Sequence, residues 1–269
     1  MNMKIEILLS CMHQKDASII QRTHVQSDIL IINQCDIDME SKFSFIDARG
    51  NQCESRMIYT SERGLSRSRN MAIREAKGDI CLICDDDELL IDGYVDVIAK
   101  AFVKYPETDV ITFALNYPPK IFPTVEKKVG YIRAMKTNSL QIAFRRRSIV
   151  ENHISFDVTM GSGSGNGCGE EVRFLFDCLK KGLNIRYVPQ VIASVKQEGS
   201  KWFDGYTNVY FLNKGYSNRK LLGLLGAWLY SIEYAIVKYK RYKCDNTFWN
   251  AVYYQLKGTL FQWKKKNNV

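Results

Sequence analysis

The sequence predicts an α/β fold in which a mostly parallel sheet is flanked by helices, followed by a helical appendage rich in basic and aromatic residues. Apolar runs at residues 4–9, 28–32 and 80–84 have the length and composition of strands, and polar residues follow each run. Helix-like segments with apolar residues three or four positions apart lie between them. Such alternation is typical of parallel sheets, because a crossover connection returns the chain to the same edge.

In the first part of the chain, the strand at residues 4–9 ends in a polar loop that begins at Ser10. We expect Asp16 to cap a short helix after this loop. The strand at residues 28–32 is an almost continuous apolar run that ends at Asn33. Such a run is expected where a parallel strand is buried on both faces.

Weaker strand signals at residues 43–46 and 57–59 precede a helix predicted at residues 65–76. Ser66 is in position to cap the start of this helix, and Gly78 is in position to end it. The helix therefore leads directly into the apolar strand that follows.

Beyond that strand, the pattern predicts a helix at residues 92–105 and a strand at residues 109–115. Residues 116–137 break the pattern with prolines, aromatic residues and basic residues, which indicates an irregular loop. A strand at residues 141–144 and a short helix at residues 148–152 follow.

Residues 161–169 contain five glycines, which predicts a mobile loop able to close over substrates. This loop opens directly into an amphipathic helix at residues 170–181. Strands at residues 184–188 and 191–195 are expected to complete the sheet.

The strand at residues 80–84 runs straight into four acidic residues, Asp85, Asp86, Asp87 and Glu88. Crowded carboxylates repel one another unless positive charge lies among them. Hard oxygen ligands suit Mg²⁺ or Mn²⁺, and ligands bind at the carboxyl ends of strands in open α/β sheets. The alternative interpretation is a solvated acidic turn after a buried strand.

Three arginines, Arg63, Arg67 and Arg69, surround the first turn of the helix at residues 65–76. The helix dipole disfavours cations at that end, so their presence favours a bound anion such as a diphosphate. The alternative is a solvated basic turn.

Glu170 and Glu171 lie in the first turn of the helix that follows the glycine-rich loop. A carboxylate at this position can act as a general base. The alternative is structural, because acidic residues at a helix N-terminus are electrostatically favourable.

The charge is unevenly distributed along the chain, whose formal net charge is +9. Residues 218–269 contain ten basic and only two acidic side chains, so the preceding part is almost neutral. We expect residues 1–215 to form the main domain and residues 216–269 a helical extension. Its aromatic and basic residues, with the apolar run at residues 221–237, are typical of a helix on an anionic membrane surface. The alternative is a helical hairpin packed on the main domain.

The eight cysteines are scattered, and no second Cys or His pair accompanies Cys81 and Cys84 at a zinc-like distance. We therefore interpret these two as small core residues. With no signal peptide at the N-terminus, we expect reduced thiols and a cytoplasmic protein, with peripheral attachment to the inner face of the cell membrane through the basic tail.

The order of these motifs resembles glycosyltransferase family 2 of bacterial polysaccharide biosynthesis. The resemblance covers roughly residues 3–196 and is carried by the following segments: Gly64-Leu65-Ser66-Arg67-Ser68-Arg69-Asn70, Gly78-Asp79, Asp85-Asp86-Asp87, and Gly169-Glu170-Glu171 with Phe174 beyond. It implies the GT-A fold, a Rossmann-like and mostly parallel sheet flanked by helices. It also implies an inverting, metal-dependent transfer of a hexosyl or N-acetylhexosaminyl group from a nucleotide-diphosphate sugar, expected to be a UDP-sugar. The acceptor would be a hydroxyl of a glycan or lipid-linked molecule, as in capsule or O-antigen synthesis.

The resemblance also implies a role for individual residues. Glu171 matches the position of the family's catalytic base, and Glu170 would orient it or bind acceptor. The usual Glu-Asp pair is here Glu-Glu. Mn²⁺ or Mg²⁺ would be held by Asp87 with Asp85. The donor would be bound by the following residues: Ser10, Asn33, Arg69, Asp85 and Asp86.

Two other classes of protein remain as alternatives. A sugar nucleotidyltransferase would also use paired aspartates and a metal, but it would normally have a glycine-rich basic loop after the first strand, and Ser10–Gln14 contains no glycine. A non-catalytic basic protein that binds polyanions is favoured only by the tail. The nearly neutral main domain argues against nucleic acid as a partner.

Overall fold

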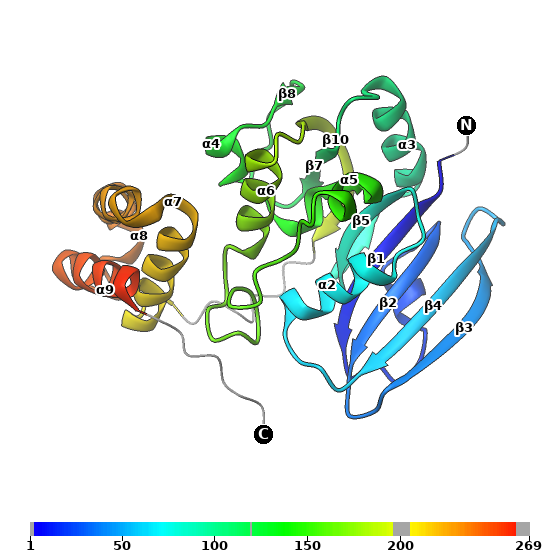
Figure 1. The fold of residues 1–269 in the computed structure, drawn as a ribbon, viewed down its shortest axis with the longest axis horizontal. Helices are drawn as coiled ribbons and strands as arrows, with labels where there is room; N and C mark the ends of the chain where they lie inside the picture. Colours follow the sequence, from blue (N-terminus) through cyan, green and yellow to red (C-terminus); the bar gives the residue numbers. More distant parts are fainter. Residues whose placement is uncertain (1–2, 119, 196–204, 262–269) are drawn as a thin grey trace.

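The computed structural model describes residues 3–118, 120–195 and 205–261 (Figure 1). A single mixed sheet crosses the main part of the molecule, and its strand order is β3-β4-β2-β1-β5-β9-β7-β10-β6, with β8 paired to β10. Helices α7, α8 and α9 gather at one end of the molecule, beside α6 (Figure 1). The expected α/β domain and helical appendage are thus both present.

The N-terminal half of the sheet is parallel, as predicted. Its four parallel strands lie in the order β4 (Gln52–Thr60), β2 (Asp28–Gln34), β1 (Ile5–Met12) and β5 (Ile80–Asp85). At the edge, β3 (Met39–Ile46) is antiparallel to β4. The weak strand signals at residues 43–46 and 57–59 therefore belong to two longer strands of one hairpin. The β3 signal is weak because every one of its side chains is at least partly exposed.

The second half of the sheet mixes directions. Its strands are β9 (Ile142–Arg145), β7 (Val110–Asn116), β10 (Ile185–Val195), β6 (Glu88–Leu90) and the two-residue β8 (Lys127–Lys128). β7 and β10 are parallel, whereas β9 is antiparallel to both β5 and β7, and β6 and β8 are antiparallel to β10. The two strands expected after residue 183 form one strand with register shifts between Val188 and Ala193.

The helices that pack around this sheet or connect its strands are, in the described part of the α/β domain, α1 (Ile19–Arg22), α2 (Leu65–Glu75), α3 (Tyr94–Lys104), α4 (Tyr131–Ala134), the 3₁₀ helix η1 (Ser139–Gln141), α5 (Arg146–Glu151) and α6 (Glu170–Lys180). Alternate side chains of β1 and β5 enter opposite cores, as the period of a strand requires. Ile7 and Leu82 join the core formed with α1 and α3, whereas Leu8 and Ile83 join the core formed with α2, α5 and α6. Both faces of the parallel strands are therefore buried.

Three predictions about local backbone structure were wrong. The helix predicted to start at an Asp16 cap begins only at Ile19, and the Asp16 carboxylate accepts from the Ser18 N–H (2.9 Å). The hydroxyl of Ser66 does not cap α2, because it donates to the carbonyl of Met160 at 2.7 Å. Gly78 does not end α2 but lies where a Cβ atom would approach the Cβ of Glu6 to 2.6 Å. Its role is close packing of the chain against β1.

The C-terminal helices fold into a bundle of α7 (Asn208–Val237), α8 (Tyr239–Tyr242) and α9 (Phe248–Leu260). Gly223 interrupts α7 with φ of 71° and ψ of −175°. The hydroxyl groups of Tyr210 and Tyr234 are 2.6 Å apart, whereas 24 residues of straight helix would span about 36 Å. α7 is therefore two segments, residues 208–222 and 224–237, folded back on one another. The expected domain boundary at residue 215 falls within the first segment.

α9 crosses the first segment of α7 at very short range. A Cβ atom at Gly215 would lie 1.9 Å from the carbonyl oxygen of Gln255, and one at Gly258 would lie 2.0 Å from that of Leu212. Only glycine at both positions permits this backbone contact. The basic run at residues 264–266, which belongs to the predicted membrane-binding tail, lies outside the described residues.

Candidate active site

The carboxyl ends of β1, β2 and β5 meet at one edge of the sheet. In the pairing register Ser10 on β1 lies opposite Asp85 on β5, and Cys11 lies opposite Asn33 on β2. Three of the residues selected from the sequence are thus brought together by the parallel strands. This edge is where ligands bind in open α/β sheets.

Arg69 lies at the centre of a buried ionic network at this edge. Its Nη2 atom donates to both carboxylate oxygens of Asp85 at 2.9 Å, and its Nη1 atom donates to Glu170 Oε1 at 3.1 Å. The arginine side chain is 1% exposed. The network joins α2, the end of β5 and the start of α6, so it fixes the acidic turn relative to the helix that carries Glu170 and Glu171.

The loop around Phe156 holds the guanidinium group in place. The Arg69 Cζ atom lies 5.4 Å from the centroid of the Phe156 ring, which stacks on Phe174 with 4.5 Å between centroids. The Asn70 side chain bonds both backbone groups of Phe156, at 2.9 and 2.7 Å. Adjacent residues of α2 therefore position both the arginine and the ring beneath it, which is the arrangement of a cation–π contact.

The glycine-rich loop packs against the start of α2. The N–H of Leu65 donates to the carbonyl of Ser162 at 2.9 Å, and a Cβ atom at Gly163 would lie 3.1 Å from the Gly64 Cα. The backbone has positive φ at four glycines of the loop, residues 161, 163, 165 and 169. The glycines therefore permit an ordered, hydrogen-bonded conformation; the predicted closure of this loop over substrates remains a prediction.

The two glutamates at the start of α6 have different environments. Glu170 is 7% exposed and bonds Arg69, while its Oε2 atom has no hydrogen-bond partner within the described ranges. Glu171 is partly buried, and burial followed by the negative charge of Glu170 raises its pKa to about 8. A general base is most effective when its pKa is close to the working pH. Of the two, Glu171 has the electrostatic environment suited to accepting a proton.

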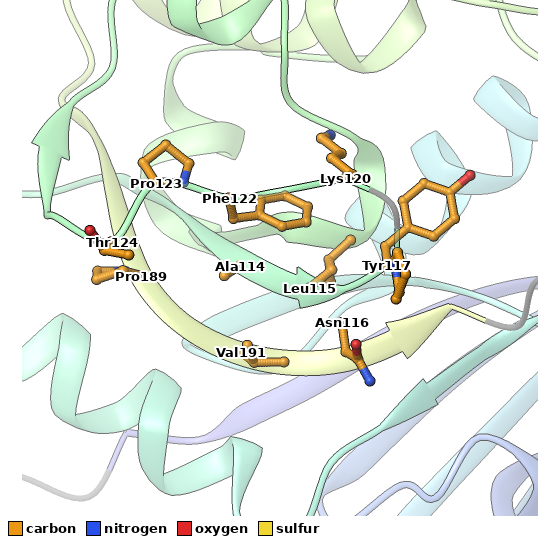
Figure 2. A pocket seen from close by; sticks show the side chains of 11 residues that line it. Ala114, Leu115, Asn116, Tyr117, Lys120, Phe122, Pro123, Thr124, Pro189 and Val191 are labelled. Carbon is orange, nitrogen blue, oxygen red and sulfur yellow. The ribbon is translucent and has the colours of Figure 1, made fainter.

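A pocket of about 350 Å³ opens at the carboxyl end of β7, beside the middle of β10 (Figure 2). Its walls are Ala114 to Pro118, Lys120, Phe122 to Thr124, Pro189 and Val191. The Lys120 Nζ atom donates to the carbonyl of Lys136 at 3.2 Å and to the Asn138 side chain at 3.4 Å. Burial lowers the pKa of Lys120, and the negative charge of Glu171 acts in the opposite direction. Its Nζ atom also lies 4.8 Å from the Phe122 ring centroid. Lys120 was missed in the sequence, where residues 116–137 showed only an aromatic and basic loop.

The acidic cluster is less concentrated than the sequence suggested. Asp86 and Asp87 are exposed in the turn between β5 and β6, whereas Glu88 is 1% exposed on β6. Neither carboxyl oxygen of Glu88 has a hydrogen-bond partner in the described part of the chain. Burial, and then the charge of Asp85, raise the pKa of Glu88 well above its ordinary value. The Arg69 guanidinium, which pairs with Asp85, therefore offsets part of the repulsion that was expected to require a metal ion.

The donor set at this turn still fits a divalent cation that a substrate helps to hold. No group of three or more His, Cys, Asp or Glu among the described residues is arranged to hold a metal by itself. Asp87 nevertheless places a hard carboxylate on an exposed turn, two residues from Asp85. Mg²⁺ is commonly bound in this way, by one or two carboxylates together with substrate phosphates.

The other residues predicted to bind the donor have contacts within the protein. Asn33 is fully buried, and its amide group bonds the N–H and carbonyl of Gln14 at 3.0 and 2.8 Å. Ser10 accepts a hydrogen bond from Ser68 at 2.8 Å. Both contacts shape the edge of the site; whether Ser10 and Asn33 also contact the donor remains a prediction.

Of the three arginines near the start of α2, only Arg69 belongs to the buried network. Arg63 pairs with Asp36 at 2.5 Å, and Arg67 pairs with Glu62 at 2.9 Å. These acidic partners explain how two of the cations are accommodated near a helix N-terminus without a bound anion. Whether an anion such as a diphosphate binds at this end of the helix remains a prediction.

The first segment of α7 contacts the loop that precedes α6. Ser217 accepts from the Asn166 side chain at 3.0 Å and donates to the carbonyl of Cys168 at 3.1 Å. Lys220 pairs with Asp157 at 3.1 Å. The helical bundle therefore forms part of the support of the site.

The sheet, the acidic turn and the acid-bearing helix together define a glycosyltransferase with the GT-A fold. More specifically, residues 14–163 match the family model for glycosyl transferase family 2, and this match spans more than half of the chain. The chain therefore belongs to this family. A comparison with curated protein sequences gives no match.

Solved structures support the same fold. The chain is similar to S. aureus TarS 1–349 in complex with UDP-GlcNAc, with 13% identity, a TM-score of 0.62, and coverage of 96% of this chain and 82% of the other. The same protein in complex with UDP gives a TM-score of 0.60 at 11% identity, covering 91% and 76%. The mannosyltransferase PcManGT from Pyrobaculum calidifontis, in complex with GDP-Man and Mn²⁺, gives 0.50 at 10% identity, covering 96% and 74%. At these identities the similarity shows the fold.

Proposed function

We propose that this glycosyltransferase is inverting and metal-dependent, and that it transfers a sugar from a UDP-sugar to a hydroxyl of a glycan or lipid-linked acceptor. The observation that carries the proposal is the Asp85–Arg69–Glu170 network, which ties the acidic turn to the helix bearing Glu171. The network would thereby hold the acidic turn, which faces the leaving diphosphate in this proposal, in a fixed position relative to the proposed base Glu171. The UDP and UDP-GlcNAc complexes of TarS support the choice of donor.

In this mechanism Glu171 accepts the proton of the acceptor hydroxyl as its oxygen bonds to the anomeric carbon. The bond from that carbon to the diphosphate oxygen breaks at the same time, and the single displacement inverts the configuration. Mn²⁺ or Mg²⁺ bound at Asp87, beside Asp85, would neutralise charge on the leaving diphosphate. Arg69 orients both Asp85 and Glu170, and the pocket next to Lys120 is the proposed entry for the acceptor.

The donor contacts of Ser10, Asn33 and Asp86 belong to the same proposal, as does a role in capsule or O-antigen synthesis. We further propose that residues 1–215 carry the chemistry in the cytoplasm, and that residues 216–269 bring the enzyme to the inner face of the membrane. The basic and apolar composition of the second unit supports this arrangement.

Exchanging each glutamate for glutamine tests the assignment of the base. Glu171→Gln keeps the size of the side chain but removes its basicity, so transfer should fall by roughly 10²- to 10⁴-fold while UDP affinity stays nearly unchanged. Glu170→Gln is the matched control, since it lies in the same helical turn but contacts Arg69. It should slow the chemical step less and reduce acceptor affinity or loop order more.

The pH profile gives a second readout of the same variants. Since the pKa of Glu171 is raised to about 8, transfer should increase about tenfold per pH unit below that pKa, and Glu171→Gln should lose this limb. The folded protein also binds more protons than the unfolded chain between the ordinary Glu value of 4.5 and about 8. The free energy of unfolding should therefore fall as the pH rises through this window. Normal turnover of Glu171→Gln with an inactive Glu170→Gln would move the base to Glu170, and normal turnover of both would exclude the helix as its source.

A further inference from the structure

The second segment of α7 has an unusual distribution of side chains. Its buried positions carry small residues, Ala227, Ser231 and Ala235, which are all 0% exposed. The large apolar residues of the segment face outwards: Leu225 (73% exposed), Trp228 (39%), Leu229 (72%), Ile232 (42%), Ile236 (61%) and Val237 (58%). Positions 225, 229, 232 and 236 are three or four residues apart and so form one helical face. We call these four side chains the apolar face.

Polar groups fill much of the interior that this segment shares with its neighbours. Gln255 is 0% exposed, and its Nε2 atom donates to the carbonyl of Ser231 at 3.3 Å. The Asn218 side chain donates to the Ser231 hydroxyl at 3.4 Å, and Trp228 Nε1 donates to the Thr259 hydroxyl at 2.9 Å. Among the described residues, large aromatic side chains occupy the interior around Phe211 and Tyr242, where Ala235 near the end of the segment packs against them.

This pattern is the reverse of the one that water favours. In water, burial of large apolar side chains drives folding, so they are expected inside. In lipid that driving force is absent, and helices associate through small residues and hydrogen bonds between polar side chains. The Gly215 and Gly258 contacts between α7 and α9 fit the same description. The bundle is therefore built for an apolar environment on the side of the apolar face.

The length of the segment determines whether it can span a bilayer or only lie at its surface. Residues 208–237 are long enough for a membrane span, and an 18-residue window within them has a mean hydropathy of 1.3, but the fold at Gly223 divides them. Residues 224–237 extend only about 21 Å, whereas the hydrocarbon core is about 30 Å thick. Glu233, the single charged residue in this stretch, is exposed. A position in the plane of the interface suits such a helix, and a span does not.

The charges next to the apolar face identify the kind of membrane. Four basic residues follow the segment directly, Lys238, Lys240, Arg241 and Lys243, and the last three are exposed. Among aromatic residues, Trp249 and Tyr253 are exposed one turn apart on α9. Basic and aromatic side chains beside an apolar helical face are typical of contact with anionic phospholipid headgroups.

We propose that residues 224–237 lie within one leaflet of an anionic phospholipid bilayer, with Leu225, Leu229, Ile232 and Ile236 among the acyl chains. This deepens the proposed function, which it rests on for the lipid-linked acceptor, by assigning the membrane contact to the apolar face as well as to the basic tail. Attraction by charge alone weakens steeply with salt, whereas apolar insertion does not. The two contributions can therefore be separated.

The test measures sedimentation of the full chain with vesicles of equal parts phosphatidylglycerol and phosphatidylcholine, in low salt and in about 0.5 M NaCl. The face variant is the double substitution Leu229→Gln and Ile236→Gln. The matched control is Ile46→Gln and Val103→Gln, two apolar residues of the α/β domain with similar exposure, 66% and 67%. We expect the wild type and the control to stay bound in high salt, and the face variant to bind at least tenfold more weakly.

UDP affinity without vesicles, together with thermal unfolding, shows whether each variant remains a folded donor-binding protein. A face variant that binds UDP and unfolds like the wild type, but no longer binds vesicles, supports the proposal whether or not the choice of acceptor is right. Equal vesicle binding by the face and control variants would overturn it. The proposal would also be overturned if all forms lost vesicle binding in high salt. The same holds if the wild type formed a dimer through this face and did not bind vesicles. A protein that binds vesicles but no UDP would leave the membrane contact standing and contradict the proposed donor.

Discussion

The sheet of the α/β domain and the second segment of α7 differ in the side chains that they bury. The sheet buries large apolar residues in two cores, and its deepest charged group, Arg69, is paired on both sides with carboxylates. The second segment of α7 instead buries alanine and serine and exposes leucine, isoleucine and tryptophan, while the large buried side chains of the bundle lie around Phe211 and Tyr242. The difference shows that two regions of one chain can bury side chains of different size and polarity. In the α/β domain the buried ion pairs connect the elements of the candidate active site, and the exposed apolar face of α7 is the surface that we propose contacts lipid.

Loss of the proposed metal site should have the largest effect, and this effect should be confined to sugar transfer by the α/β domain. Asp87→Ala, or an excess of chelator on the wild type, should reduce transfer by about 10³-fold or more, because several kcal/mol of charge stabilisation on the leaving diphosphate is removed. Vesicle binding should not change, since the substitution lies in the other unit. Transfer would be followed with a radiolabelled donor, and UDP binding by calorimetry with and without Mn²⁺. Full activity of Asp87→Ala would end the metal role of that turn.

A smaller effect is expected on the free energy of unfolding when the Asp85–Arg69–Glu170 network is broken. Arg69→Met leaves Asp85 and Glu170 without their buried cation, so the free energy of unfolding should fall by about 3–5 kcal/mol. Urea unfolding monitored by circular dichroism measures this change.

The control for that experiment is an exposed ion pair of the same domain. Arg147→Met removes a contact of 2.7 Å with Glu151, but the arginine side chain is 85% exposed. The expected loss is below about 1 kcal/mol. If both variants lost the same amount, the network around Arg69 would be no more important for folding than a surface pair.

The smallest effect concerns packing in the bundle. Gly258→Ala places a methyl group 2.0 Å from the carbonyl oxygen of Leu212, and the forced separation of α9 from α7 should cost about 1–3 kcal/mol. Gly167→Ala is the control, because nothing lies within 4 Å of its Cβ position. Urea unfolding of the two variants is compared, together with the near-UV signal of Trp228, which bonds α9 through Thr259. An unchanged Gly258→Ala would mean that the bundle is loosely packed in water.

Most of the α/β domain could be predicted from the sequence, because local patterns determine it. Residues 80–84 are an apolar run that becomes β5, and the amphipathic period after residue 169 becomes α6. The resemblance to family 2 also selected Arg69, Asp85 and Glu170, which the structure brings into direct contact. Their geometry was not predictable, because the partner of each side chain is set by residues far away in the sequence.

The features that the sequence did not predict also depend on contacts between residues far apart in the chain. Ser66 looked like a helix cap because capping is local, but its actual partner is 94 residues away. Lys120 carried no signal, because its relation to Glu171 depends on how an irregular loop crosses the sheet. The apolar run at residues 221–237 was recognised, but the turn at Gly223 within it was not. A glycine in a helical pattern is compatible with both a straight helix and a sharp fold.

If the apolar face lies in a leaflet as we propose, the contact between Lys220 and Asp157 limits how far from the bilayer the active site can lie. Leu225, at the start of the apolar face, is only five positions after Lys220, which pairs with Asp157 ahead of the glycine-rich loop. Even fully extended, such a stretch reaches about 18 Å. With the apolar face in a leaflet, the loop leading to Glu171 would stay within roughly that distance of the membrane plane. The active site would then lie close to the membrane plane. Such a position suits the addition of sugars near a lipid anchor and does not suit addition at the distal end of a long polymer.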